Sequence, residues 1–192
     1  RTGHRLMQLP AALMAQGLHL VSVETSTDTT RNTARQLIRH TLQEKLAELL
    51  TVNGEKPLIL SSPGQAPRLN PPWEKIGLSI SHEPGLSLGV INLKGPVGID
   101  LLGPVRISNE EIARLACDYL SPSVARQITG QARALQQIAF AEAWTAHEAS
   151  LKCLNHALTE WTPSLGATLA SCRVSQLEMP SGWAAALVQP GV

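Results

Sequence analysis

The chain has 192 residues, of which 43% are hydrophobic, and this is enough for one compact domain or two small fused halves with a buried core. Sixteen basic and fifteen acidic side chains give a formal net charge of +1. No overall field therefore selects nucleic acid or an anionic membrane as a partner, and any anion site must be local.

The cysteines and the first apolar stretch limit the cellular setting. Cys117, Cys153 and Cys172 are odd in number and include no C-x-x-C pair, which argues against a disulfide framework or a zinc site and fits the reducing cytoplasm. The stretch from 6 to 21 is too short and too polar to span a bilayer, so we expect it to be folded protein. Because the chain begins with Arg1 and not with Met, a removed leader and a secretory origin stay open as alternatives.

A long helix is predicted over residues 31–50, preceded by a short strand over 19–24 whose residues alternate in polarity. Thr29 and Thr30 lie where an N-cap is expected, and Asn53-Gly54 follows as a natural stop. The apolar residues that recur at helical spacing are Leu37, Ile38, Leu42, Leu46, Leu49 and Leu50.

Several short strands are predicted next. Residues 58–60 form a brief strand before a Ser-Ser-Pro-Gly turn. The runs 78–82, 86–92 and 97–101 are separated by turn residues and indicate an antiparallel meander, with the first and third strands roughly 10 Å apart. Because those two strands point the same way, their polar ends should meet at one rim of the sheet.

The second half repeats the order of the first. Gly103-Pro104 breaks the chain, helical material is expected from 108 to 155, and strand-like segments from 165 to 188. We therefore predict an α+β fold made of a pseudo-symmetric tandem of two similar halves, residues 1–103 and 104–192, each an antiparallel sheet packed with a long helix. No internal sequence repeat is strong enough to prove the duplication.

Three short motifs carry chemical groups. Segment 140–152 has strong helix formers and no Gly or Pro, and in a helix Trp144, Glu148 and Lys152 share one face. Asp100 ends an apolar strand two residues after Gly98, where a glycine permits close approach of another backbone or a ligand. Each motif alone favours a structural explanation: an exposed ion pair, a turn, or a hydrogen-bonded histidine at position 82.

Together, in this order and at these separations, the motifs resemble the 4'-phosphopantetheinyl transferase superfamily. Its members carry S-H, then G-[IV]-D, then W-x-x-K-E-[AS]-x-x-K, which stand here as Ser81-His82, Gly98-Ile99-Asp100 and the segment from Trp144 to Lys152. The resemblance extends from about 31 to 152. The length and the two halves resemble the Sfp-type branch rather than the shorter trimeric carrier-protein synthases.

The resemblance implies an activity. A holo-carrier-protein synthase transfers phosphopantetheine from CoA, which would lie between the halves, to a serine of an apo acyl or peptidyl carrier protein, and Mg²⁺ suits the charge on the pyrophosphate. By resemblance, Asp100 and Glu148 are metal ligands, Lys152 approaches the phosphates, His82 donates to the 3'-phosphate of CoA, and Ser81 is a further CoA-binding residue. Glu148 is also a candidate to deprotonate the acceptor serine, although the sequence leaves the general base open.

Two further segments resemble the nucleotide-binding parts of the family. Residues 34–39 are similar to A-[GAR]-R-x-L-x-R, which implies that Arg35 lies near the adenine end of CoA. Residues 64–68 are similar to an altered G-K-P loop, which implies the same for Arg68. For a helix arginine, an ordinary solvated face explains the pattern equally well.

The chain departs from the family pattern at three places. Leu102 stands where many relatives have an acidic metal ligand, and we expect Glu83, which directly follows the S-H pair, to replace it. His147 replaces the first lysine of the K-E pair, and Gln65-Ala66 removes a cation from the nucleotide loop. These losses support the alternative of a weak or inactive homologue that binds CoA or a carrier protein, while an unrelated structural α+β protein would require an accidental triple match.

The expected partner is an acidic carrier protein. Between 121 and 137 the charged residues are Arg126 and Arg133, and this positive strip could face an acidic helix, although a solvated helix face explains it as well. We expect a monomer, because one chain supplies both halves. The sequence does not identify the carrier protein or its pathway.

Overall fold

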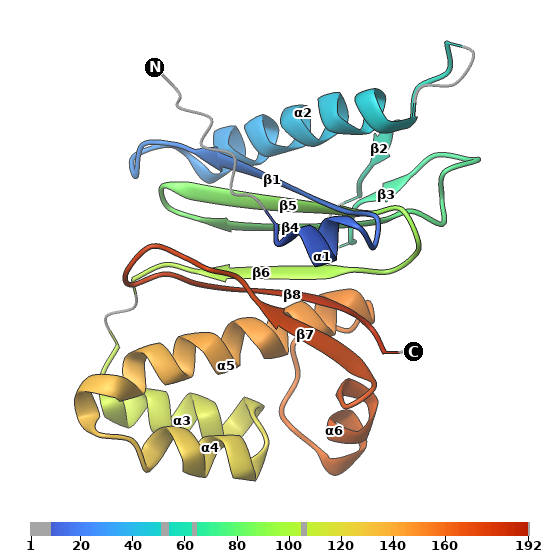
Figure 1. Cartoon of the computed structure of the whole chain (residues 1–192). Helices are drawn as coiled ribbons and strands as arrows, with labels where there is room; N and C mark the ends of the chain where they lie inside the picture. Colours follow the sequence, from blue (N-terminus) through green and yellow to red (C-terminus); the bar gives the residue numbers. More distant parts are fainter. Residues whose placement is uncertain (1–8, 51–53, 63–64, 105–106, 192) are drawn as a thin grey trace.

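The computed structural model describes residues 9–50, 54–62, 65–104 and 107–191, and these form an α+β fold with antiparallel sheets. Its layers follow one another as helix, sheet, sheet and helices (Figure 1). The helices are α1 (Ala11–Met14), α2 (Arg31–Leu50), α3 (Asn109–Tyr119), α4 (Pro122–Thr129), α5 (Arg133–Cys153) and α6 (Pro163–Leu169). The strands are β1 (Leu18–Glu24), β2 (Ile59–Leu60), β3 (Arg68–Leu69), β4 (Gly77–Glu83), β5 (Leu86–Asn92), β6 (Gly98–Leu102), β7 (Cys172–Gln176) and β8 (Ala184–Pro190).

The first half is a sheet of order β1-β5-β4 covered on one face by α2. α2 has the predicted bounds, and the Thr30 hydroxyl accepts a hydrogen bond from the Thr33 backbone N–H, as an N-cap does. Ile38, Leu42 and Leu46 are fully buried, since they recur on the helix face that meets the sheet. The predicted stop at Asn53 lies outside the described residues.

The second half is a sheet of order β6-β8-β7 covered by α5. Successive residues of a strand in this sheet point to opposite faces, and each face belongs to a different hydrophobic core. Ile99 and Leu101 of β6 face the first sheet, where they pack with Leu88 of β5 and Leu187 of β8. The other face packs on α5, and α3 and α4 lie beyond that helix. A core is thus shared between the two sheets.

The predicted meander is wrong for its third strand. β4 and β5 pair antiparallel as expected, but β6 hydrogen-bonds to β8 and not to β5. β6 instead lies beside β4, which removes the predicted separation of roughly 10 Å between them. Alternation within a run predicts a strand but not its partner, because the partner is set by residues far along the chain.

The C-terminal prediction also needs one correction, since the segment from 165 begins in a helix. Pro163 starts α6 and the Thr162 hydroxyl accepts from the Leu165 N–H, a standard helix start. The strands β7 and β8 follow, as expected. No described helix is long and apolar enough to cross a membrane.

Candidate functional site

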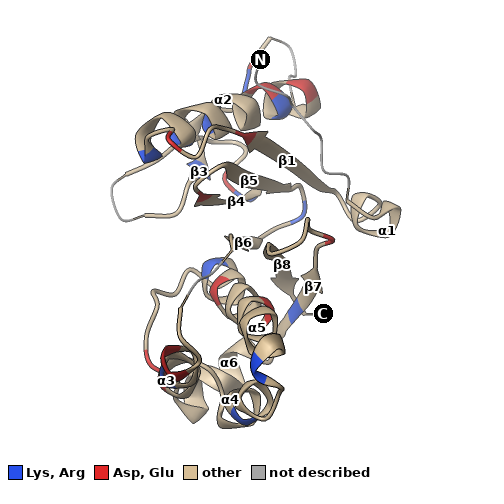
Figure 2. Ribbon diagram, turned by 90° about the vertical axis from the view of Figure 1, so that its left-hand side faces the viewer, with Lys and Arg blue, Asp and Glu red and all other residues tan. Residues whose placement is uncertain are grey.

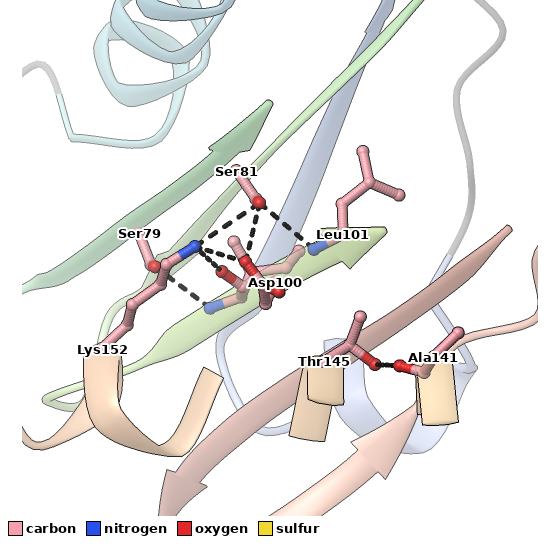
Figure 3. Close-up of polar contacts among 8 residues, drawn as sticks. Ser79, Ser81, Asp100, Leu101, Ala141, Thr145 and Lys152 are labelled. Atoms are coloured by element: carbon pink, nitrogen blue, oxygen red, sulfur yellow. Dashed lines mark hydrogen bonds and ion pairs between the residues drawn. The ribbon is translucent and has the colours of Figure 1, made fainter. Parts of the chain in front are cut away.

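The three motifs meet at one point of the structure (Figure 3). Ser81 on β4 donates a hydrogen bond to Asp100 Oδ1 on β6, over 2.9 Å, and the Lys152 ammonium on α5 lies 2.6 Å from the same oxygen. Ser81 and Asp100 are both buried, at 6% and 7% exposure. Residues 71 positions apart in the chain therefore form one polar cluster in the interior.

Serine side chains join β4 to β6 at this point. The backbone N–H of Ile99 donates to Ser79 Oγ at 3.0 Å, and the N–H of Leu101 donates to Ser81 Oγ at 3.1 Å. The second contact lies two residues further along both strands than the first. The strands β4 and β6 therefore run in the same direction, as predicted. Alternate serines thus satisfy backbone donors that a neighbouring strand would otherwise bind.

A glycine lets α5 approach the strand that carries Asp100. A Cβ at Gly98 would overlap the carbonyl oxygen of Ala149 and lie 2.7 Å from the backbone nitrogen of Cys153. The predicted close approach of another backbone is confirmed, and that backbone is α5. Because Asp100 is two residues along and points to the same side, Lys152 on the last turn of α5 reaches it.

The charge of Asp100 affects the pKa values of two further carboxylates. Burial first, and then Asp100, raise the pKa of Glu148 above its ordinary value, and the same two causes raise the pKa of Glu83. The Gly103 backbone N–H also bonds to Glu83, which holds the end of β4 beside the residue that follows β6. Negative charge therefore concentrates at the end of β6 (Figure 2 shows the charged residues along the ribbon).

This donor set suits a divalent cation in its chemistry. Carboxylate oxygens are the preferred ligands of Mg²⁺, and a bound cation would relieve the repulsion from Asp100 that, after burial, raises the pKa values of Glu83 and Glu148. Within the described ranges, no three His, Cys, Asp or Glu side chains are grouped closely enough to hold a metal ion together. The ligand roles of Asp100, Glu148 and Glu83 therefore stay proposals.

Basic side chains lie near His82. Burial first, and then the charges of Arg35, Arg31, Lys152 and Arg39, lower the pKa of His82 to about 4. Its Nδ1 lies 3.0 Å from Ser87 Oγ. Next to it is a cavity of about 250 Å³ whose wall includes Arg31. Sequence reasoning identified Arg35 but missed Arg31 and Arg39, although their i, i+4 and i+8 spacing on one helix indicates a common face.

The structure does not bring Arg68 to this cluster. Arg68 is exposed on β3 and pairs in register with Leu60 of β2, and no described residue of the cluster forms a hydrogen bond or ion pair with it. Gly64, which begins the predicted loop, lies outside the described residues. The expected nucleotide contact of Arg68 stays a prediction.

The side chains at two positions that depart from the family pattern, 147 and 102, pack against other side chains in the protein interior. His147 is buried, burial lowers its pKa, and its ring centroid lies 6.4 Å from that of Trp144. Its Nε2 has no hydrogen-bond partner among the described residues. Leu102 packs against the core formed by α3, α4 and α5. Neither residue therefore replaces the charge that the family pattern has at its position.

The positive strip of residues 121–137 has an acidic side chain beside it in the structure. Arg126 is exposed, but Arg133 pairs with Glu110 of α3, over 3.2 Å between exposed side chains. Exposed pairs of this kind contribute little to stability, so Arg133 stays accessible to another acid. The strip thus also contains an acidic neighbour that segment 121–137 does not show.

The comparison with protein families agrees with this geometry. Residues 96–180 match the family model described as the 4'-phosphopantetheinyl transferase superfamily. Over this segment the chain is similar to that superfamily. The segment contains Asp100, Glu148 and Lys152, while Ser81 and His82 lie outside it, and Ser81 contacts it only in the folded structure. A search of curated proteins finds no match. The superfamily match supports a role in phosphopantetheinyl transfer in general.

Proposed function

We propose that this protein transfers 4'-phosphopantetheine from CoA to a serine of an apo acyl or peptidyl carrier protein, with Mg²⁺ as cofactor. The observation that carries the proposal is the meeting of Ser81, Asp100 and Lys152, from three separate motifs, in one buried hydrogen-bonded cluster. A chance resemblance of three short motifs would not require them to meet in space. The superfamily match over 96–180 supports the same reaction.

The reaction forms one bond and breaks another. The acceptor serine oxygen bonds to the phosphorus that carries pantetheine, the bond from this phosphorus to the bridging oxygen breaks, and adenosine 3',5'-bisphosphate leaves. The serine proton passes to a base. A bound Mg²⁺ would neutralise charge on the pyrophosphate, and Asp100, Glu148 and Glu83 are the side chains we assign to hold it.

Glu148 is our candidate for the base, directly or through a water. Burial and the neighbouring Asp100 raise its pKa, which makes its carboxylate a better proton acceptor than an exposed glutamate. It lies on α5 one turn before Lys152, so one helix presents both a proton acceptor and a cation for the phosphates.

The nucleotide end is assigned to α2 and β4. We propose that His82, Arg35 and the adjoining arginines Arg31 and Arg39 bind the 3'-phosphate of CoA. Ser81 has a different role in this proposal. Its hydroxyl already donates to Asp100 and accepts from Leu101 N–H and Lys152, so it positions these groups rather than binding CoA.

We also propose where CoA lies in the fold, the oligomeric state and the cellular compartment. The sheets have equivalent strand orders, β1-β5-β4 and β6-β8-β7, and each is covered by one long helix, which supports a pseudo-symmetric tandem with CoA between its halves. β6 belongs by sequence to residues 1–103 but pairs with β8. The halves come from one chain, which supports a monomer, and the cysteine usage supports the cytoplasm.

The test is mass spectrometry of a panel of apo carrier proteins incubated with the protein, CoA and magnesium. A phosphopantetheine mass gain that Glu148→Ala abolishes would establish the transferase and identify its acceptor class. If no acceptor gains mass while CoA still binds in calorimetry, the protein is the inactive binding homologue. The loss of charge at Leu102 and at the buried His147 is the observation that favours this second candidate.

A further inference from the structure

The structure brings together two cysteines that lie far apart in the sequence. Cys153 ends α5 and Cys172 begins β7, and α6 lies between them in the chain. Cys153 is buried, at 5% exposure, against Ala186 and Val188 of β8, and Cys172 packs against the same cluster. Because β8 pairs with β7, the end of α5 lies over the strand next to Cys172.

The face of β7 to which Cys172 belongs is turned towards α5. Successive residues of a strand point to opposite faces, so Cys172 and Gln176 share one face. The Gln176 side chain donates to the backbone carbonyl oxygen of Glu142 on α5, over 3.0 Å. The strand therefore directs Cys172 towards α5, in agreement with its packing against the cluster that contains Cys153.

The two thiols are joined by a hydrogen bond in which Cys153 donates and the Cys172 sulfur accepts. This direction follows because the bond favours the protonated form of Cys153 and the ionised form of Cys172. Burial raises the pKa of both thiols, that of Cys153 to about 12. Cys172 is partly exposed. It is therefore the thiol that an oxidant in solution reaches, and its ionised form has a hydrogen-bond donor beside it.

We propose that Cys153 and Cys172 form an intramolecular disulfide when the protein meets a small-molecule disulfide such as oxidised glutathione, with Cys172 reacting first. The Cys172 thiolate attacks one sulfur of the oxidant, whose S–S bond breaks and releases one thiolate. The Cys153 thiolate then attacks the Cys172 sulfur of this mixed disulfide and releases the second thiolate. The two thiol protons pass to the released thiolates, so one S–S bond breaks, another forms, and the oxidant is reduced to two thiols.

The raised pKa values slow the reaction in both directions. Little thiolate is present at neutral pH, so the disulfide forms slowly. A thiol of high pKa is also a poor leaving group, so the disulfide is reduced slowly once it has formed. The pair is thus suited to a lasting link between α5 and β7 rather than to rapid switching.

The disulfide would close the loop that contains α6 and fasten the last turn of α5 to the sheet. Lys152, which bonds to Asp100, lies on that turn. Closing a loop restricts the unfolded chain, and the folded protein already holds the two thiols together. The oxidised protein should therefore be more stable, with the end of α5 fixed in the position from which Lys152 reaches Asp100.

The first test needs no variant. Reduced wild-type protein is incubated with oxidised glutathione, free thiols are then blocked with N-ethylmaleimide, and peptides are analysed by mass spectrometry without reduction. We expect a cross-linked peptide pair that joins Cys153 to Cys172, while Cys117, which is exposed on α3, carries glutathione or the blocking reagent. If Cys117 takes up glutathione and no cross-link between Cys153 and Cys172 forms in the same sample, the proposal is overturned.

The order of attack is tested with two single variants that unfold thermally as wild type does in reducing buffer. Cys153→Ala should accumulate a glutathione adduct at Cys172, because the second attack is missing. Cys172→Ala should show little adduct at Cys153, because that thiol is buried. The control Cys117→Ser should form the cross-link as wild type does. An adduct at Cys153 in Cys172→Ala, with none at Cys172 in Cys153→Ala, would contradict the assigned order.

The last measurement compares thermal unfolding of Cys117→Ser before and after oxidation, because this variant has no third thiol with which the pair could exchange. We expect oxidation to raise the melting temperature by about 5 °C or more, and dithiothreitol to reverse the rise. An unchanged or lower melting temperature would show that the thiols meet only when the fold is distorted, which contradicts pairing in the native structure. None of these measurements uses CoA, a metal ion or a carrier protein, so their outcome is independent of the proposed transferase activity.

Discussion

Ser81 and Ser79 make comparable contacts to β6 but differ in what else they touch. Each hydroxyl accepts one buried backbone N–H of β6, whereas only Ser81 also contacts Asp100 and Lys152. We expect Ser81→Ala and Ser79→Ala to lower the free energy of unfolding by similar amounts, about 1 to 3 kcal/mol, because each leaves one N–H unpaired. Ser81→Ala alone should lower kcat, by roughly 10²-fold, since it also releases two groups of the site. Urea unfolding and phosphopantetheine transfer measure the two effects, and equal activity of the variants would disprove the positioning role.

His82 makes stability depend on pH. Its pKa of about 4 lies below the ordinary value of 6.5, because of burial and the arginines of α2. Between these two pH values the unfolded chain binds a proton that the folded chain does not, so stability is full above pH 6.5 and is lost as the pH falls towards 4. Thermal unfolding across this window should show a smaller loss for His82→Gln than for wild type, and the control His156→Gln should follow wild type. Identical pH profiles for wild type and His82→Gln would refute the assignment.

At the residue scale, the sequence predicted which side chains belong to the candidate site better than it predicted their contacts. The three motifs identified Ser81, Asp100 and Lys152, which the fold brings together. The donor role of Ile99 and Leu101 to serine hydroxyls could not be predicted, because it depends on β4 and β6 lying side by side. The lowered pKa of His82 likewise depends on its burial in the fold and on the arginines of a helix that lies more than 40 residues earlier in the chain.

Among the elements, α5 depends on one glycine of β6. Replacing Gly98 by alanine would drive a methyl group into the backbone at Ala149 and Cys153. We expect Gly98→Ala to lower the free energy of unfolding by about 3 kcal/mol, because backbone atoms cannot yield as a side chain tip can. Gly130→Ala is the control, since Gly130 caps α4 with a helical backbone and its tightest contact would be 3.0 Å. A loss after Gly98→Ala no larger than that of the control would contradict the close packing.

Element types were predicted well where a local pattern decides them. The bounds of α2 follow from its apolar face and its threonine cap. α6 was missed because its seven residues are too few to show a helical period, and only Thr162 and Pro163 mark its start. The partner of β6 was wrong because no local signal specifies that β8, more than 80 residues later, lies next to it.

The whole molecule is held by a core that both sheets share. Leu88 of β5 is completely buried there against β6 and β8 residues. We expect Leu88→Ala to lower the free energy of unfolding by about 2 to 5 kcal/mol while unfolding remains a single transition, because the lost contacts belong to both halves. Leu135→Ala, at a residue that is 52% exposed, should change stability by less than about 0.5 kcal/mol. Calorimetry that resolves two separate transitions in Leu88→Ala would show that the halves unfold independently.

The order of helices and strands within each half could be predicted from the sequence, but the way the two halves pack together could not. The sequence indicates helical material followed by strand-like segments in each half, and the equivalent sheet orders are consistent with that. Nothing local indicates that the two sheets stack through one core, because this depends on which face of each strand meets the other half.

The serine contacts between β4 and β6 also affect how such a site changes over evolutionary time. Backbone ladders form with nearly any side chain, but this join needs particular hydroxyls, and one of them also bonds to Asp100. A descendant that no longer catalyses would still need Ser81 and its partners to keep its halves together. Retention of Ser79 and Ser81 by themselves in a relative is therefore weak evidence of activity, and loss of a group that has no structural contact at this join is the better marker of an inactive homologue.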